Sequence, residues 1–419
     1  MGLEIGVFPG SGLMVWLAFI AALIAIPAIA ASPAARRAAA APALLVAAGA
    51  VLAAIVSLLK IPAPPADAIA FAAKAALAML GFASAAQLRV SRLARQCPSA
   101  FRLTFGGAPI YFFACSLAAF IMLPELSIPS AMLVGGALML NGAAFDRRAV
   151  AATPAPATIK AAVRNESAAI IALGIPFATL LAANATAATP NEPALEPLMT
   201  ASFSVLKGFA YGGVAGLAAA AAGAWYRRRT LQQRSLDGQF AILAGVIMFV
   251  LGPGVGADPV VGATAAGLLW GEQTSASSTT RLRIRRYVDR AVIPAAYFGF
   301  GAVLLPRLLD ADMLSVVFAL AAVTVMRAGP RLAILQTPEI TKESQMFLAW
   351  FGGAPGAASA LFVMMLIGNP ALLDADAVLT VTAIAVMFGV AAARLTSKPL
   401  AEYYVKQTAL AKRRRAWAG

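Results

Sequence analysis

Long apolar stretches recur along almost the whole of this chain of 419 residues. An α-helix needs about 20 predominantly apolar residues to cross the hydrocarbon core of a bilayer, which is about 30 Å thick. Hydrophobic residues make up 61% of the sequence and charged residues 12%, whereas charged residues form about a quarter of a typical soluble domain. Because the bilayer core offers the backbone no hydrogen-bond partners, such stretches fold as helices. We therefore predict an all-α polytopic membrane protein.

The apolar stretches predict about 13 transmembrane helices. They lie at roughly 8–31, 40–60, 66–87, 101–123, 127–145, 158–186, 198–225, 238–253, 257–271, 289–306, 311–335, 343–368 and 376–395. The first stretch lacks the basic opening of a secretory signal, so we expect a retained span. Only a Gly-Pro-Gly-Val-Gly segment separates the two short stretches between 238 and 271, so a single span there is the alternative. The prediction is one transmembrane domain over 1–397 and a short basic tail over 398–419.

Basic residues fall mostly into every second loop, and acidic residues fall mostly into the loops between. The basic loops include Arg36-Arg37, Arg147-Arg148 and, after the eleventh stretch, Arg331. Lys60 and Arg307 are the exceptions on the acidic side. Cytoplasmic loops carry an excess of Lys and Arg. With 13 spans, this bias predicts an N-terminus outside the cell and a C-terminus in the cytoplasm.

The net charge of +15 comes largely from these cations near the ends of the spans. Cations in such places orient the spans and meet anionic lipid headgroups. The predicted partners are therefore the lipid bilayer and a small ion or solute, and nucleic acid is not expected.

The residues for most catalytic and cofactor chemistry are missing from the sequence. It has no histidine and two cysteines, Cys97 and Cys115, which give neither a disulfide framework nor a metal site. No phosphate-binding loop, metal-ligand cluster or catalytic triad is visible. We therefore predict no cofactor, no bound metal and no enzymatic activity.

Two of the stretches contain residues that interrupt helices. The fifth holds Asn141-Gly142, a turn dipeptide, and the twelfth holds Gly352-Gly353-Ala354-Pro355, where proline in a helix interior costs about 3 kcal/mol. These stretches are fifth in the sets 1–6 and 8–13. Paired interruptions at corresponding places in two inverted repeats indicate the substrate site of a transporter. The alternative is that these small residues only allow close helix packing.

Six sequence elements occur in an order that is typical of one family. They are residues 101–109, 126–129, 164–167, 300–305, 325–330 and 350–359. From about residue 71 to 397 the chain resembles the monovalent cation:proton antiporters of the sodium/hydrogen exchanger superfamily. The resemblance implies two inverted six-helix repeats with broken crossing helices 5 and 12. It also implies a location in the inner membrane of a bacterial type of cell, and a homodimer in which a core bundle moves against a dimer-forming bundle.

The chain departs from the family where the ion is bound. Family members carry an Asn-Asp or Asp-Asp pair in span 6, and this chain has Ile170-Ile171. They carry a Thr-Asp pair at the break in span 5 and an arginine at the break in span 12, where this chain has neither. Two branched hydrocarbons cannot bind sodium or carry a proton. The predicted substrate site consists of Asn141, Glu166, Ser167, Ile170, Ile171, Gly353 and Pro355.

Glu166, Ser167 and Arg327 match the family pattern. The resemblance implies a buried ion pair between Glu166 and Arg327 that holds two core helices together, and direct substrate contact is the alternative. Ser167 either bonds back to its own helix or binds substrate. Lys74 and Lys207 lie inside predicted spans and either extend toward the interface or face the core, where they would suit an anionic substrate.

Three functions stay open at this point. The resemblance implies secondary active transport of the cation:proton antiporter type. The missing carboxylates predict that the chain does not run the family's aspartate-based sodium–proton exchange. The alternatives are transport of a small anionic or neutral solute by the same fold, and a non-transporting member with an interaction or regulatory role.

Overall fold

The computed structural model describes residues 42–141, 155–187, 195–229, 236–274, 278–337 and 340–418. Within these residues the chain is helical apart from turns, caps and one isolated bridge, and it holds no β-strand. The all-α membrane fold predicted from the sequence is confirmed. The predicted span at 8–31 and the last four residues of the fifth stretch, Gly142 among them, lie outside the described residues.

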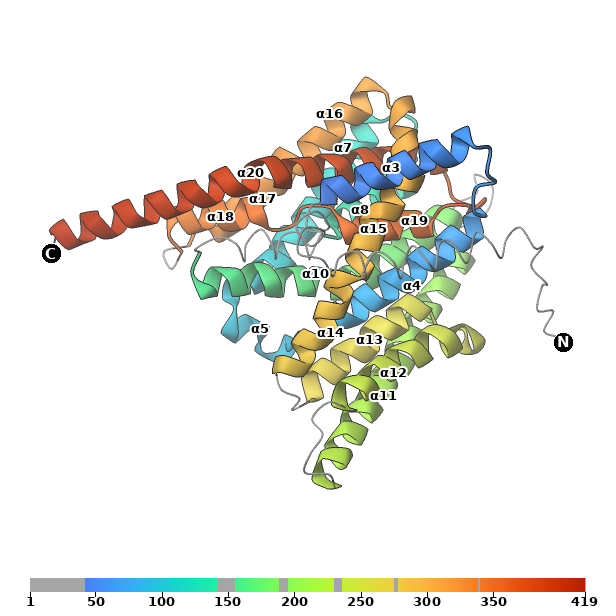
Figure 1. The fold of residues 1–419 in the computed structure, drawn as a ribbon, viewed down its shortest axis with the longest axis horizontal. Helices are drawn as coiled ribbons and strands as arrows, with labels where there is room; N and C mark the ends of the chain where they lie inside the picture. The colour runs from blue at the N-terminus through green and yellow to red at the C-terminus, as the bar shows by residue number, and fades with distance from the viewer. Residues whose placement is uncertain are drawn as a thin grey trace.

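The helices of the first half follow the apolar stretches in order (Figure 1). They are α3 (Pro42–Leu58), α4 (Ala66–Ala85), α5 (Val90–Gln96), α6 (Pro98–Arg102), η1 (Leu103–Gly107), α7 (Ala108–Met122), α8 (Ile128–Met139), α10 (Ala157–Ala187) and α11 (Leu195–Arg229).

The second half continues in the same way. Its elements are α12 (Leu236–Leu251), η2 (Gly252–Val255), α13 (Pro259–Gln273), α14 (Ser278–Arg290), α15 (Val292–Val303), η3 (Leu305–Asp310), α16 (Met313–Ala321), η4 (Ala322–Met326), α17 (Arg327–Leu335), α18 (Lys342–Phe351), α19 (Ala357–Met365) and α20 (Ala375–Ala418).

Seven helical segments of the described chain are long and apolar enough to cross a membrane. They are Ala66–Ala85, Pro98–Met122, Ala157–Thr186, Leu198–Tyr226, Gly238–Val255, Met313–Leu335 and Ala375–Thr396. Every predicted stretch after the first overlaps a described helix. The two short stretches between 238 and 271 are the separate helices α12 and α13, and between them Gly256 adopts the left-handed conformation at φ 69°. The total of 13 spans remains a prediction.

The two halves of the chain are interrupted at corresponding helices. The π-helical segments η1 and η4 lie in the fourth span of each predicted set of six. In the fifth spans, α8 ends at Met139, and residues 352–356 separate α18 from α19. A π-helical turn holds an extra residue that redirects the helix, and such turns are frequent at functional sites. The breaks predicted in spans 5 and 12 are present.

Close main-chain contacts join α3, α4, α11, α13 and α15, which we call the glycine bundle. A Cβ atom at Gly212 or Gly216 of α11 would overlap main-chain oxygens of α13. Gly267 of α13 lies equally close to α4, and Gly301 of α15 lies equally close to α3. Small residues are the means by which membrane helices approach closely, because lipid provides no hydrophobic force that drives helices together.

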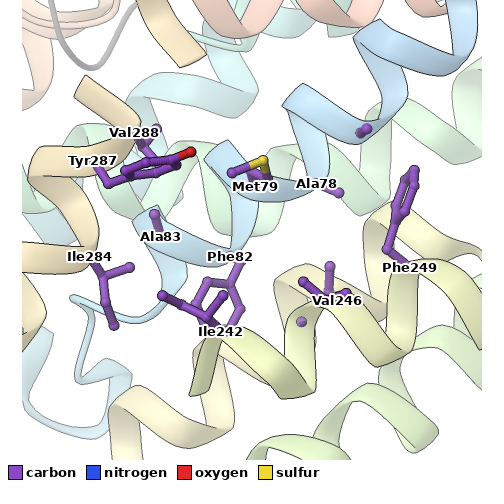
Figure 2. A pocket seen from close by; sticks show the side chains of 13 residues that line it. Ala78, Met79, Phe82, Ala83, Ile242, Val246, Phe249, Ile284, Tyr287 and Val288 are labelled. Carbon is purple, nitrogen blue, oxygen red and sulfur yellow. The ribbon is translucent and has the colours of Figure 1, made fainter. Parts of the chain in front are cut away.

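A cavity of about 370 Å³ opens between α4, α12, α13 and α14 (Figure 2). Its walls are apolar side chains, among them Ala78 and Phe82 of α4 and Val246 and Phe249 of α12. Ile284, Tyr287 and Val288 of α14 close one end.

The last helix, α20, runs without interruption from its membrane span to Ala418 and projects beyond the bundle (Figure 1). Tyr404 lies past the predicted span and is buried. Its ring centroid lies 4.9 Å from that of Phe347 on α18, and its hydroxyl lies 3.3 Å from the Ser344 hydroxyl. No helix end marks the division predicted at residue 397, so that division remains a prediction.

Candidate functional site

The two broken helices meet at Asn141. After α8 the backbone becomes extended at Leu140, with φ −65° and ψ 120°. Asn141 then forms an antiparallel bridge with Pro355. The hydroxyl of Ser359 on α19 donates to the Leu140 carbonyl, which the end of α8 leaves without a helical partner. Two segments that are 214 positions apart in sequence (355 minus 141) are therefore held together.

The break in span 12 has a local cause. Gly352 is extended, with φ −99° and ψ 159°, and Gly353 has a φ of 72°, which side-chain-bearing residues rarely adopt. Pro355 lacks the amide hydrogen that a continuing helix needs. α19 begins directly afterwards, at Ala357. The sequence at this point therefore excludes an unbroken span.

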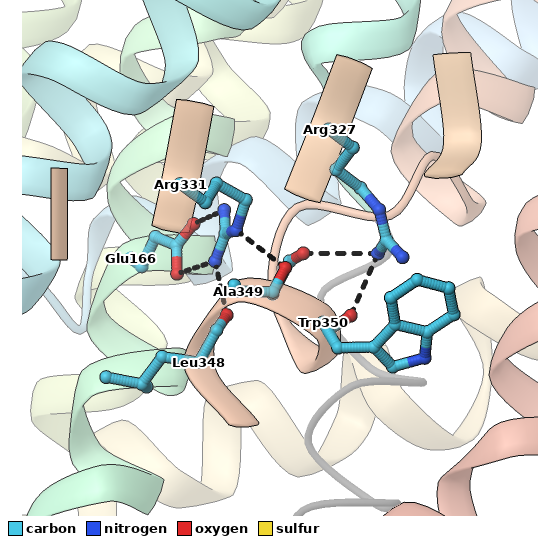
Figure 3. A network of polar contacts seen from close by, with 7 residues as sticks. Glu166, Arg327, Arg331, Leu348, Ala349 and Trp350 are labelled. Atoms are coloured by element: carbon cyan, nitrogen blue, oxygen red, sulfur yellow. Dashed lines mark hydrogen bonds and ion pairs between the residues drawn. The ribbon is translucent and has the colours of Figure 1, made fainter. Parts of the chain in front are cut away.

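Glu166 of α10 forms an ion pair with Arg331 of α17 (Figure 3). Nη1 of Arg331 donates to Oε1 of Glu166, and Nη2 donates to Oε2 at 2.9 Å. Glu166 is 0% exposed and Arg331 is 3% exposed. Both carboxylate oxygens are engaged by one guanidinium, the bidentate geometry that binds a carboxylate most strongly.

The same guanidinium also binds the end of α18. Its Nε donates to the Ala349 carbonyl at 3.1 Å, and Nη2 donates to the Leu348 carbonyl at 2.8 Å. The last carbonyls of a helix have no partner within the helix and carry partial negative charge. Arg331 therefore satisfies both a carboxylate and a helix end in the middle of the fold. We call α8, α10, α17, α18 and α19 the charged bundle.

The predicted pairing of Glu166 with Arg327 is wrong. Nη1 of Arg327 donates to the carbonyls of Trp350, at 3.0 Å, and Gly352, at 3.2 Å. Its guanidinium carbon lies 5.1 Å from the centre of the Trp350 ring (Figure 3). Arg331 follows Arg327 by four residues on the same helix face, and at this position it reaches α10. Arg331 was also assigned to a loop, whereas it is buried within α17.

Comparison with known proteins assigns the family. The sequence model described as "Sodium/hydrogen exchanger, transmembrane" matches residues 15–403 of the chain. This protein belongs to the sodium/hydrogen exchanger family. No curated protein sequence matches the chain.

Solved structures of an exchanger share the fold. The chain is similar to the sodium proton antiporter MjNhaP1 from Methanocaldococcus jannaschii at pH 8, with a TM-score of 0.62 and 16% identity over 86% of this chain and 96% of that one. It is also similar to an electron-microscopy structure of the same antiporter, with a TM-score of 0.52 and 15% identity over 87% of this chain and 96% of that one. At this identity the likeness concerns the fold.

The remaining residues of the predicted site lie around the bridge in this exchanger-family fold. Asn141 is 0% exposed, and its amide nitrogen and oxygen find no hydrogen-bond partner among the described residues. The Ser167 hydroxyl is also buried without a partner in the part of the chain that the structure describes. Ile170 and Ile171 are buried in the apolar core together with Leu140.

The sequence did not predict a role at the site for Arg331 or Ser359.

Lys74 and Lys207 lie away from the bridge. Lys207 is exposed, and its ammonium group lies beside Gly256, in the turn between α12 and α13. Lys74 is partly buried and close enough to interact electrostatically with Asp258, the N-cap residue of α13. Both lysines therefore point toward the same end of α13, which agrees with extension toward the interface rather than with a place in the core.

Proposed function

We propose that this protein is a secondary active transporter of the cation:proton antiporter type that lacks the aspartate-based ion site. Its substrate binds where Asn141 meets Pro355. The observation that carries the proposal is the fully buried Asn141 amide, which has no partner among the described residues. Leaving a buried polar group without a partner costs about 1–3 kcal/mol. A polar substrate at the bridge would remove that cost.

Glu166 is a poor candidate for the proton carrier. Both of its oxygens accept from Arg331, so a proton or a cation would have to displace a guanidinium. That guanidinium also binds the Leu348 and Ala349 carbonyls. Removing Arg331 from Glu166 would therefore leave several buried groups without partners. Glu166 and Arg331 act in this proposal as a structural clamp that keeps α10, α17 and α18 together while the substrate site changes its access.

The charges near the bridge favour a second candidate function. Arg327 and Arg331 bring two positive charges, Glu166 brings one negative charge, and the end of α18 contributes about half a negative charge. The balance is slightly positive. Transport of a small anionic or neutral solute by the same fold is therefore the second candidate, with the Asn141 amide as donor and acceptor.

The proposal includes an arrangement in the membrane. The chain acts as a homodimer in an inner membrane, with its N-terminus outside and its C-terminus in the cytoplasm. The alternation of basic and acidic loops supports this topology. Single cysteines introduced at Glu192 and Arg228 should then react with an impermeant reagent from opposite sides. Reaction of both from one side would exclude the topology.

Transport by reconstituted protein tests the function. Proteoliposomes that contain a pH-sensitive dye are given sodium, potassium, lithium and a panel of small anions and neutral solutes in turn. We expect one solute to move protons or to be taken up, and Asn141→Leu to abolish that flux. Leucine has a similar shape, and the amide it replaces has no partner in the described structure, so the melting temperature should hardly change.

Asn165→Leu is the matched control. Asn165 carries the same amide on α10 and is partly exposed, so its replacement should leave the flux intact. Flux that persists in Asn141→Leu would refute the site. A wild-type protein that neither moves any solute nor is stabilised by one would favour the non-transporting reading.

A further inference from the structure

The apolar cavity of Figure 2, which we call the groove, is lined along α4 and α12 by apolar side chains. It follows α4 from Ala75 to Ala83, which at 1.5 Å per residue is about 12 Å. Its rim includes Met79 and Val246, which are 41% and 50% exposed. At about 370 Å³ its volume lies in the range of ligand-binding cavities. An occupant must therefore be apolar and slender over most of its length.

The end of the groove that α14 closes is strongly basic. Arg283, Arg286, Tyr287 and Arg290 are all exposed, and their spacing of three, four and seven residues places them on one helix face. Tyr287, which is 62% exposed, is also a wall of the cavity. The exposed stripe of three arginines therefore adjoins this end of the groove.

The opposite face of α14 is held by contacts within the protein. Arg285 is 2% exposed, binds Asp289 at 2.8 Å and donates to the Ser84 hydroxyl at 2.7 Å. The helix is thus fixed on its buried side and presents its remaining arginines outward. A helix with an apolar face and an arginine-rich face lies in the plane of the membrane interface.

We propose that this groove binds one acyl chain of an anionic phospholipid, with the headgroup on Arg283, Arg286 and Arg290. The lipid comes from the leaflet that faces the basic loops. A transmembrane helix of a second copy is about 10–12 Å wide with its side chains and would rest on the rim without filling the groove. An apolar chain with a negative charge at one end matches both the walls and the stripe. The site is separate from the Asn141 bridge, so it does not depend on the proposed function.

Native mass spectrometry of the purified full-length protein tests the proposal. The protein is offered equal amounts of phosphatidylglycerol and phosphatidylcholine with the same acyl chains. We expect retention of phosphatidylglycerol to exceed that of phosphatidylcholine by on the order of tenfold, because each arginine near an anionic headgroup adds to the attraction. Arg283→Gln/Arg286→Gln/Arg290→Gln should remove this preference. The matched control Arg92→Gln/Arg95→Gln, on exposed positions of α5, should keep it.

A second variant tests the groove itself. Val246→Trp places a large ring at the rim, so retention of both lipids should fall while the melting temperature stays near that of the wild type. Glycerol 3-phosphate alone should not compete, because it has no acyl chain. Equal retention of the two lipids, or an arginine variant that keeps the preference, would overturn the proposal. So would a Val246→Trp variant with unchanged lipid retention and an altered oligomeric state, because the groove would then be an interface between copies.

Discussion

The glycine bundle and the charged bundle are held together by different means. In the glycine bundle, α11 and α13 approach so closely at Gly212 and Gly216 that no side chain fits between them. In the charged bundle, Arg331 joins Glu166 of α10 to the end of the broken helix α18. The packing of the glycine bundle depends on residues without side chains, which let the helix backbones touch. The packing of the charged bundle depends on a few charged groups. Continuous helices can pack through small residues, whereas a broken helix needs polar partners for its ends.

The difference has a consequence for movement. Close main-chain packing along whole helices resists sliding, which suits a fixed scaffold. The charged bundle contains both breaks, and its helix α17 directly follows the π-helical segment η4. Breaks in membrane helices persist where they line a site. We therefore infer that the substrate site travels with the charged bundle and that the glycine bundle stays in place.

Removing one partner of the buried ion pair should have the largest effect. Glu166→Ala leaves Arg331 buried beside carbonyls alone, and breaking such a pair costs about 3–5 kcal/mol. Folded yield and melting temperature in detergent should fall sharply. The double variant Glu166→Leu/Arg331→Met should lose less than the sum of the single changes, because it leaves no uncompensated charge. Full thermal stability of Glu166→Gln would contradict the clamp.

A matched pair of glycine substitutions tests the other bundle. A Cβ atom at Gly212 would overlap the Gly262 main chain, whereas one at Gly213 would meet only the Leu269 side chain at 3.7 Å. Gly212→Ala should cost about 1–3 kcal/mol through overpacking. Gly213→Ala should be neutral or gain up to about 1 kcal/mol, because alanine favours the helix. Equal melting temperatures for the two variants would mean that α11 and α13 are not in close contact.

A smaller, pH-dependent loss of stability is expected when Asp374, which binds Ser127 at the start of α8, is replaced. Burial raises the pKa of Asp374, but hydrogen bonds from the Ser127 amide, at 2.8 Å, and hydroxyl, at 2.7 Å, outweigh it, so the pKa lies below its usual value. A lowered pKa gives stability that is present above the usual value, about 3.9, and is lost as the pH falls through the lowered pKa. Asp374→Asn should therefore cost about 1 kcal/mol at pH 7. Melting curves at pH 7 and pH 3 should show this deficit shrinking, and a deficit that grows in acid would contradict the assignment.

The smallest effect is expected at an exposed ion pair. Arg307 binds Asp376, whose side chain is 91% exposed. Exposed pairs contribute about 0–1 kcal/mol and are screened by salt. Asp376→Asn should change the melting temperature little at low salt and not at all in high salt. A fall in melting temperature as large as that of Glu166→Ala would show that the difference in burial does not decide how much each ion pair stabilises the protein.

The sequence predicted the helices and their breaks because their causes are local. Asn141-Gly142 and Gly353 with Pro355 interrupt a helix wherever they occur, and the symmetry of the two sets of six predicted that the interruptions meet. The partner of Glu166 could not be predicted in this way. Arg327 and Arg331 lie one turn apart on the same face of α17, so only the packed positions of α17, α10 and α18 decide that Arg331 reaches Glu166 while Arg327 reaches the carbonyls of Trp350 and Gly352. The cavity beside α14 depends on the packing of four helices and left no pattern in the sequence.

We propose that this chain lacks the carboxylate chemistry of sodium–proton exchange and that Glu166 is structural. The most direct test is sodium-driven proton flux in proteoliposomes that contain a pH-sensitive dye, with wild type, Glu166→Gln and Ile170→Asn/Ile171→Asp compared. We expect no sodium-driven flux from the wild type or from Glu166→Gln, and we expect flux from the variant that restores the Asn-Asp pair. Clear sodium-driven flux from the wild type that is lost in Glu166→Gln would mean that Glu166 carries the proton and is not only structural.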